Sequence, residues 1–233
     1  MNAHLLMLLA AFIWGTTFIA QTTGMETIGP MGFTLARYVI GMVVVFPLAL
    51  YEAKNFSLIY YMKSSSKQMW QALGLGALMF GGIGFQQTAL QYTQVANAAF
   101  ITALYVPCVP LFAWLLFRTA IMPRIWIGVA FSIGGSYLLS GSADVRAQWG
   151  DILVGAGALF WAGHIVLIGV VIKNIKAPFQ LAFLQSAVCA ALAGALTFMF
   201  EGPDLVDFLP VMPELIYAGL FSVGIAYTLQ LIA

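Results

Sequence analysis

Eight stretches of mostly apolar residues divide this chain into segments of membrane-spanning length. A helix needs about 20 such residues to cross the hydrocarbon core of a bilayer. Only 7% of the 233 residues are charged, too few to cover a water-facing surface around these stretches. Backbone groups in lipid must pair within their own segment, so we expect helices. The expected spans are His4–Gln21, Met31–Tyr51, Met69–Gln91, Ala96–Phe117, Trp126–Ser140, Ile152–Ile172, Phe179–Phe200 and Leu215–Ala233.

The segments between these spans are short, and the longest covers only residues 52–68. None of them can hold a folded domain, so we predict an all-α, polytopic membrane helix bundle. Lysine and arginine favour cytoplasmic loops. They gather in the loops after the second, fourth and sixth spans, whereas the other loops contain only Arg146. This bias predicts a cytoplasmic N-terminus in the cell membrane.

The chain contains an internal repeat. Ala11-Phe12-Ile13-Trp14-Gly15 in the first span resembles Phe160-Trp161-Ala162-Gly163 in the sixth, with the two tryptophans 147 residues apart. Pro30 and Pro178 open the second and seventh spans at an offset of 148. A five-helix unit is odd-numbered, so its second copy is inverted, as in many secondary transporters. We predict one unit over residues 1–144 and a second over residues 145–233 that stops after three helices.

The same segments resemble the drug/metabolite transporter superfamily, in its EamA branch. The resemblance covers the whole chain and is carried by Ala11–Gly15, Pro30 with Ala36-Arg37, Ala96–Leu104 with Pro107, Gly150-Asp151 leading to Phe160–Ala162, and Gly224–Tyr227. It implies ten helices in two inverted halves and export or exchange of small metabolites such as amino acids. Phe117–Ala120 lacks the Gly-Glu pair often found there, so a role for that acid does not carry over.

Polar and aromatic residues expected at membrane depth are the candidate substrate-binding residues. His164 could hydrogen-bond to cargo, or only bond between helices. If it binds cargo, His164→Ala should lower transport with little loss of expression. Trp14 and Trp161, related by the repeat, could stack on cargo or only pack. Arg37 could neutralise a carboxylate, or extend along its stem to the headgroups.

Further candidates lie near the ends of the expected spans or at repeat-related positions. Gln185 is the repeat counterpart of Arg37. Two prolines, Pro107 and Pro110, should kink the fourth span and free carbonyl groups near residues 103 and 106. The remaining candidate substrate-binding residues are Gln86, Asn97, Tyr105 and Tyr227.

The motifs that the chain lacks narrow the function. There is no phosphate-binding Gly-Lys-Ser/Thr motif, metal cluster or hydrolytic triad. We therefore expect no cofactor, no metal and no enzyme activity. A secondary transporter working by alternating access is the first hypothesis, and a non-transporting membrane scaffold or a lipid-modifying enzyme are the alternatives. Membrane lipid and a small-molecule substrate are the expected partners, nucleic acid is not, and a homodimer is left open.

Overall fold

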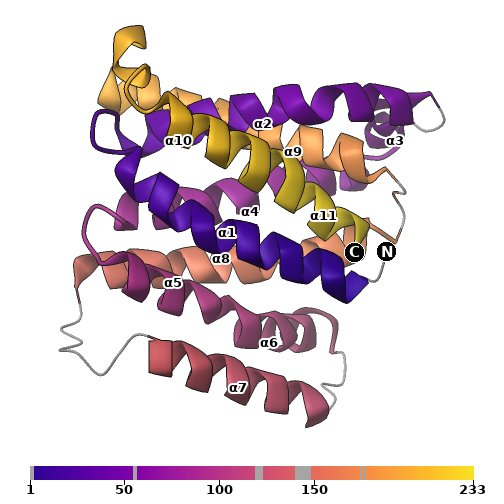
Figure 1. Cartoon of the computed structure of the whole chain (residues 1–233). Helices are drawn as coiled ribbons and strands as arrows, with labels where there is room; N and C mark the ends of the chain where they lie inside the picture. The colour runs from indigo at the N-terminus through magenta and orange to yellow at the C-terminus, as the bar shows by residue number, and fades with distance from the viewer. Residues whose placement is uncertain (1–2, 55–56, 119–122, 140–147, 174, 176) are drawn as a thin grey trace.

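The computed structural model describes residues 3–54, 57–118, 123–139, 148–173, 175 and 177–233, and within these it is helical without strands. The predicted all-α bundle is confirmed (Figure 1). The α-helices are α1 (Ala3–Thr23), α2 (Pro30–Ala53), α3 (Leu58–Ser64), α4 (Ser66–Ala89), α5 (Val95–Ala103), α6 (Tyr105–Phe117), α7 (Pro123–Leu139), α8 (Trp149–Val171), α9 (Pro178–Leu196), α10 (Met212–Tyr217) and α11 (Tyr227–Ile232). A π-helical turn, Thr197–Glu201, ends α9; a 3-10 turn follows at Leu205–Phe208, and a π-helical segment, Ala218–Ala226, joins α10 to α11.

Six helical segments of the described chain are long and apolar enough to cross a membrane. They are α1, α2, α5 with α6, α8, α9 with its π-helical turn, and Met212–Ile232. The other two predicted spans also form helices. α7 has 17 residues, and α4 has 24 residues but begins with the polar sequence Ser66-Lys67-Gln68. The predicted boundary between repeat units at residue 144 lies outside the described residues.

Two antiparallel helix pairs form the centre of the bundle. α2 packs along α9 and α4 packs along α8, and these are the most extensive helix contacts among the described residues. α1 and the α10–α11 segment lie together on one side of this centre, α5 and α6 lie beside α8, and α7 is outermost (Figure 1).

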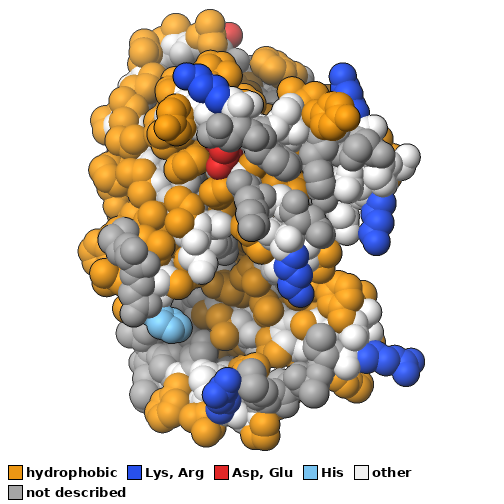
Figure 2. Space-filling view, turned by 90° about the vertical axis from the view of Figure 1, so that its right-hand side faces the viewer, with side chains coloured by type: hydrophobic (Ala, Val, Ile, Leu, Met, Phe, Trp, Pro, Cys, Tyr) orange, Lys and Arg blue, Asp and Glu red, His pale blue; other side chains and the backbone are white. Residues whose placement is uncertain are grey.

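The two ends of the bundle differ in charge. The start of α1 and the C-terminal ends of α2, α6 and α8 lie at one end (Figure 1), where Lys and Arg side chains gather (Figure 2). Acidic residues on the opposite connections include Glu26, Glu201 and Asp204. Arg146, Asp144 and Lys176 lie outside the described residues. Within the described chain, the separation follows the alternation of loops from which the orientation was predicted.

The central helices α2 and α9 cap each other with carboxylates. Glu201, at the end of α9, accepts hydrogen bonds from the backbone N–H groups of Met31 (2.8 Å) and Gly32 (2.7 Å) in the first turn of α2. Glu52, at the end of α2, accepts one from the backbone N–H of Gln180 (2.9 Å) in the first turn of α9. A helix N-terminus has unpaired N–H groups and a partial positive charge, so a carboxylate there is favourable.

We expect Glu201→Ala to lower the stability of the protein by about 1–3 kcal/mol, because two backbone donors lose their acceptor. Glu52→Ala should cost less, since it removes the acceptor of one backbone donor. Thermal unfolding of purified protein in detergent measures both. Glu26→Ala, an exposed acid beyond α1, is the matched control. Equal stability of Glu201→Ala and Glu26→Ala would contradict the capping role.

The expected kink in the fourth span is present. α5 ends at Ala103 and α6 begins at Tyr105, while Pro110 lies inside α6. A proline ring clashes with the carbonyl of the residue four positions earlier, which for Pro107 is Ala103. The break therefore follows directly from Pro107, and it turns Ala103 and Tyr105 towards the interior of the bundle.

Candidate functional site

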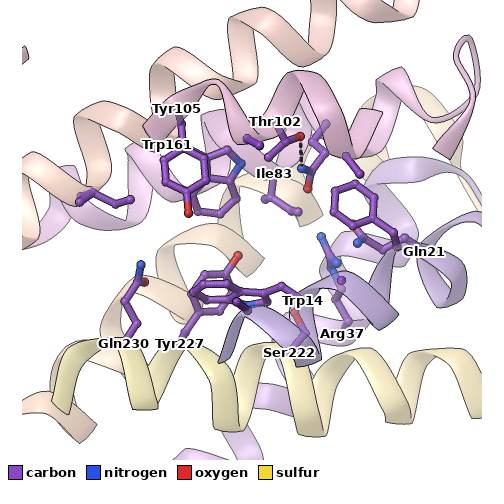
Figure 3. A pocket seen from close by; sticks show the side chains of 17 residues that line it. Trp14, Gln21, Arg37, Ile83, Thr102, Tyr105, Trp161, Ser222, Tyr227 and Gln230 are labelled. Atoms are coloured by element: carbon purple, nitrogen blue, oxygen red, sulfur yellow. Dashed lines mark hydrogen bonds between the residues drawn. The ribbon is translucent and has the colours of Figure 1, made fainter. Parts of the chain in front are cut away.

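A cavity of about 280 Å³ lies inside the bundle, between α1, α2, α4, α5, α6, α8, the π-helical segment Ala218–Ala226 and α11. This is slightly below the roughly 300–1,000 Å³ of pockets for drug-sized ligands, which suits a small metabolite. Figure 3 shows the side chains that converge on it. The lining residues are Ala11, Trp14, Gly15, Phe18, Gln21, Arg37, Ile83, Gln86, Ala99, Thr102, Ala103, Tyr105, Trp161, Ile165, Ser222, Tyr227 and Gln230.

One face of α1 forms a wall of the cavity. Its lining residues recur about once per helical turn, at Ala11, then Trp14 and Gly15, then Phe18 and Gln21. Residues spaced in this way lie on the same side of a helix. Thr16, which lies off this face, instead hydrogen-bonds to the Tyr217 hydroxyl of α10 at 2.7 Å. The helix therefore turns Trp14, Phe18 and Gln21 to the interior, whereas Phe12 is exposed on the outside.

An aromatic wall, formed by Trp14, Trp161 and Tyr227, borders the middle of the cavity. The Tyr227 ring lies 5.2 Å from that of Trp14 and is stacked at 6.0 Å on that of Trp161. On its far side Tyr227 is stacked on Tyr38 at 6.3 Å, and their hydroxyls are 3.5 Å apart. These ring separations fall in the favourable range for aromatic pairs. The wall thus joins α1, α8 and α11 into one surface.

Arg37 is the charged residue of the cavity lining. It is 1% exposed, and its Nε and Nη2 atoms have no hydrogen-bond partner. Its guanidinium lies 5.6 Å from the Phe33 ring and 5.4 Å from the Tyr38 ring. Cation–π contacts of this kind use the charge but leave the N–H donors free. In Figure 3 the guanidinium of Arg37 points towards the space between Trp14 and Gln21.

Four further buried polar atoms on cavity-lining residues have no partner. They are Nε1 of Trp14, Nε1 of Trp161, Oε1 of Gln21 and Oε1 of Gln230. A buried donor or acceptor without a partner costs roughly 1–3 kcal/mol. The cavity therefore holds several polar groups that a bound molecule can satisfy. By contrast, Gln86 already donates to the Thr102 hydroxyl at 2.8 Å.

The structure brings together most of the candidate residues predicted from the sequence. Those that line the cavity are Trp14, Arg37, Gln86, Tyr105, Trp161 and Tyr227. Arg37 does not extend to the headgroups, since its side chain is buried. Asn97 is only partly buried and lies off the cavity.

His164 and Gln185 also lie off the cavity, because they bond to each other. His164 Nε2 is 3.0 Å from Gln185 Oε1, and both residues are fully buried between α8 and α9. The ring of His164 also meets that of Trp161 edge-on at 5.8 Å. The packing alternative for His164 is therefore the one that this geometry favours.

Four polar lining residues were missed in the sequence: Gln21, Thr102, Ser222 and Gln230. The spacing of Gln21 from Trp14, seven positions, was a usable signal for a shared helix face. Ser222 lies in the π-helical segment. The apolar pattern of the sequence does not indicate the altered register of this segment.

The sequence of residues 1–141 matches the EamA-like transporter family. This chain belongs to that family. The match confirms the resemblance first seen in Ala11–Gly15 and Ala96–Leu104. Because it also has six helical segments of membrane-spanning length among the described residues, the chain is a multi-pass membrane protein.

Curated relatives of this EamA-like chain are named as transporters. An uncharacterized transporter of Archaeoglobus fulgidus is 32% identical over 185 residues, which cover 79% of this chain and 54% of the relative. The uncharacterized transporter YwfM of Bacillus subtilis is 25% identical over 197 residues, covering 79% and 62%. The chain thus matches between half and two thirds of the length of these relatives. A crystal structure with 21% identity shares the fold, with a TM-score of 0.74 over 99% of this chain and 78% of the other.

The bond between His164 and Gln185 predicts a stability effect. We expect His164→Ala and Gln185→Ala each to lower stability by about 0.6–2 kcal/mol, typical of bonds between membrane helices. The double variant should lose little more than the worse single variant, because both remove one interaction. Melting in detergent and transport per folded molecule measure the two effects separately. Lost transport at unchanged stability would restore the cargo-binding hypothesis for His164.

Proposed function

We propose that this EamA-like chain acts in secondary transport, exporting or exchanging small metabolites by alternating access across the cell membrane. The observation that carries this proposal is the cavity. It is enclosed by helices of both expected repeat units, with Trp14 and Arg37 from the first and Trp161 and Tyr227 from the second. Substrate sites between the repeats of a transporter lie in this position. Amino acids are the substrates that the family resemblance implies.

The reciprocal caps support two units related by inversion. Glu52 and Glu201 occupy nearly the same place after Pro30 and Pro178, and each caps the other helix. A two-fold axis in the membrane plane would exchange these contacts. A scaffold without transport activity gains nothing from a polar cavity between such units.

The proposed orientation places the N-terminus in the cytoplasm, because Lys and Arg gather at that end of the bundle (Figure 2). In a background without Cys108 and Cys189, we expect Leu205→Cys to react with a membrane-impermeant maleimide on intact cells. Lys54→Cys should react only after the cells are permeabilised. Both positions are exposed, so accessibility alone does not separate them. The reverse pattern would overturn the orientation.

Counter-flow in proteoliposomes tests transport. Vesicles that contain the purified chain are loaded with one unlabelled metabolite of a panel of amino acids and organic acids. Uptake of the same labelled compound is then followed. We expect transient accumulation above the level of protein-free vesicles for at least one compound. Exchange equal to protein-free vesicles for the whole panel would contradict the proposal.

A blocked cavity provides the control. In the same cysteine-free background, Ala103→Cys places a thiol on the cavity wall, and Gly128→Cys places one on the exposed face of α7 with open space around it. A bulky methanethiosulfonate reagent should stop exchange in the first variant and leave the second unchanged. Equal inhibition of both would show that the cavity is not the route of the cargo.

A further inference from the structure

The buried guanidinium of Arg37 lacks an anionic partner. Its Nε and Nη2 atoms have no hydrogen bond, and no acidic side chain is found among the described residues that line the cavity. Removing a charge from water costs several kcal/mol unless a counter-charge compensates for it. Phe33 and Tyr38 offset part of this cost through their rings, but they accept none of the guanidinium N–H donors.

The donors around Arg37 favour an anion. The indole Nε1 atoms of Trp14 and Trp161 are also buried and free, and Figure 3 shows both rings bordering the space that Arg37 enters. An aromatic wall could in principle bind an organic cation. The positive charge of Arg37 in the same cavity, without a lining carboxylate in the described chain, makes a cation unfavourable.

The single positive charge of Arg37 determines which net charge of the ligand fits the cavity best. A single carboxylate neutralises Arg37, whereas a dianionic phosphate ester would bring a second negative charge that no other charged side chain of the lining compensates. A zwitterionic amino acid would bring an ammonium group close to the guanidinium. The free acceptors, Gln21 Oε1 and Gln230 Oε1, are neutral and do not compensate for that second positive charge.

We propose that the cavity binds a small organic monocarboxylate rather than a zwitterionic amino acid. Arg37 holds the carboxylate through its planar pair of N–H donors, and the aromatic wall of Trp14, Trp161 and Tyr227 packs against the apolar body of the ligand. The inference rests on the proposed function, since it assigns a substrate class to the same cavity.

Four probes of similar size separate the charge states. They are 3-phenylpropionate, its neutral amide 3-phenylpropionamide, zwitterionic L-phenylalanine and dianionic phenyl phosphate. Binding to the purified chain in nanodiscs is followed by quenching of tryptophan fluorescence, to which Trp14 and Trp161 in the cavity wall contribute. We expect 3-phenylpropionate to bind about ten-fold more tightly than each of the others, equivalent to about 1.4 kcal/mol.

Arg37→Gln should reduce this preference to nearly equal binding of the acid and the amide. Arg37→Lys should keep part of it, because lysine retains the charge without the fork of donors. Arg124→Gln, at the exposed start of α7, is the matched control and should behave as the unmodified chain. If Arg37→Gln does not fold, the four-probe comparison on the unmodified chain still decides the question.

Equal binding of the acid and the amide, tighter binding of phenylalanine or phenyl phosphate, or no saturable binding of any probe would overturn the inference. Counter-flow distinguishes this result from failure of the proposed function. Transport of an amino acid without a carboxylate preference would reject the substrate class and leave transport standing. A carboxylate preference without any counter-flow would reject the proposed transport and leave the substrate class standing.

Discussion

Trp161→Ala is expected to reduce counter-flow at least about ten-fold per folded molecule, the effect of roughly 1.4 kcal/mol of lost cargo interaction. The substitution removes the ring that stacks on Tyr227 and opens the wall between α8 and α11. It also leaves the ring of His164 without its edge contact. Trp161→Phe keeps an aromatic face and should retain most of the activity.

Trp149→Ala is the control for this prediction, because Trp149 lies at the start of the same helix and is 64% exposed. Exchange rates are divided by the amount of monodisperse protein, which removes any loss of folding from the comparison. If Trp161→Ala and Trp149→Ala transport equally well, the aromatic wall does not contact the cargo.

Gly157→Ala is expected to lower stability by about 1–3 kcal/mol, the usual cost of forcing an extra group into a packed contact. A methyl group there would lie 2.9 Å from the Gly82 carbonyl oxygen, where α8 crosses α4. This neighbour is backbone, so the two helices would have to move apart. The movement would also displace Trp161, which packs on Gly82, and should lower transport.

Gly155→Ala is the matched control on the same helix. Its added methyl group meets only Ile101, at 4.0 Å, which is an ordinary contact. Alanine is favoured over glycine in a helix by about 0.5–1 kcal/mol, so this variant should be slightly more stable. Thermal unfolding in detergent should therefore shift in opposite directions for the two variants. Equal shifts would show that the α4–α8 contact is looser than the structure indicates.

The number and places of the helices could be predicted because lipid imposes length and apolarity on each span. Pro107 likewise predicted a kink, found as the break between α5 and α6, because the effect of a proline on a helix is local and steric. The π-helical segment Ala218–Ala226 could not be predicted, because its sequence is as apolar as the flanking turns. Within this segment Gly219 packs closely against Ile40 and the backbone of Arg37, a contact between distant parts of the chain.

Sequence reasoning identified which helix carries a candidate residue better than which way the side chain faces on that helix. Trp161 and His164 lie three positions apart on α8, yet one lines the cavity and the other faces α9. A span that is apolar on every side has no hydrophobic stripe to show which face turns inward. The side chain on the neighbouring helix determines which way a polar residue faces, and for His164 that side chain is Gln185.

The reciprocal caps of Glu52 and Glu201 restrict how α2 and α9 can move. Each carboxylate reaches the first turn of the other helix only while the two remain level, and the rise per residue is about 1.5 Å. Sliding by even one residue would break the bonds to Met31, Gly32 and Gln180 together. The capping bonds at both ends therefore oppose translation of α2 and α9 along their axes. Relative motion of the surrounding helices would then take the form of rotation about this pair.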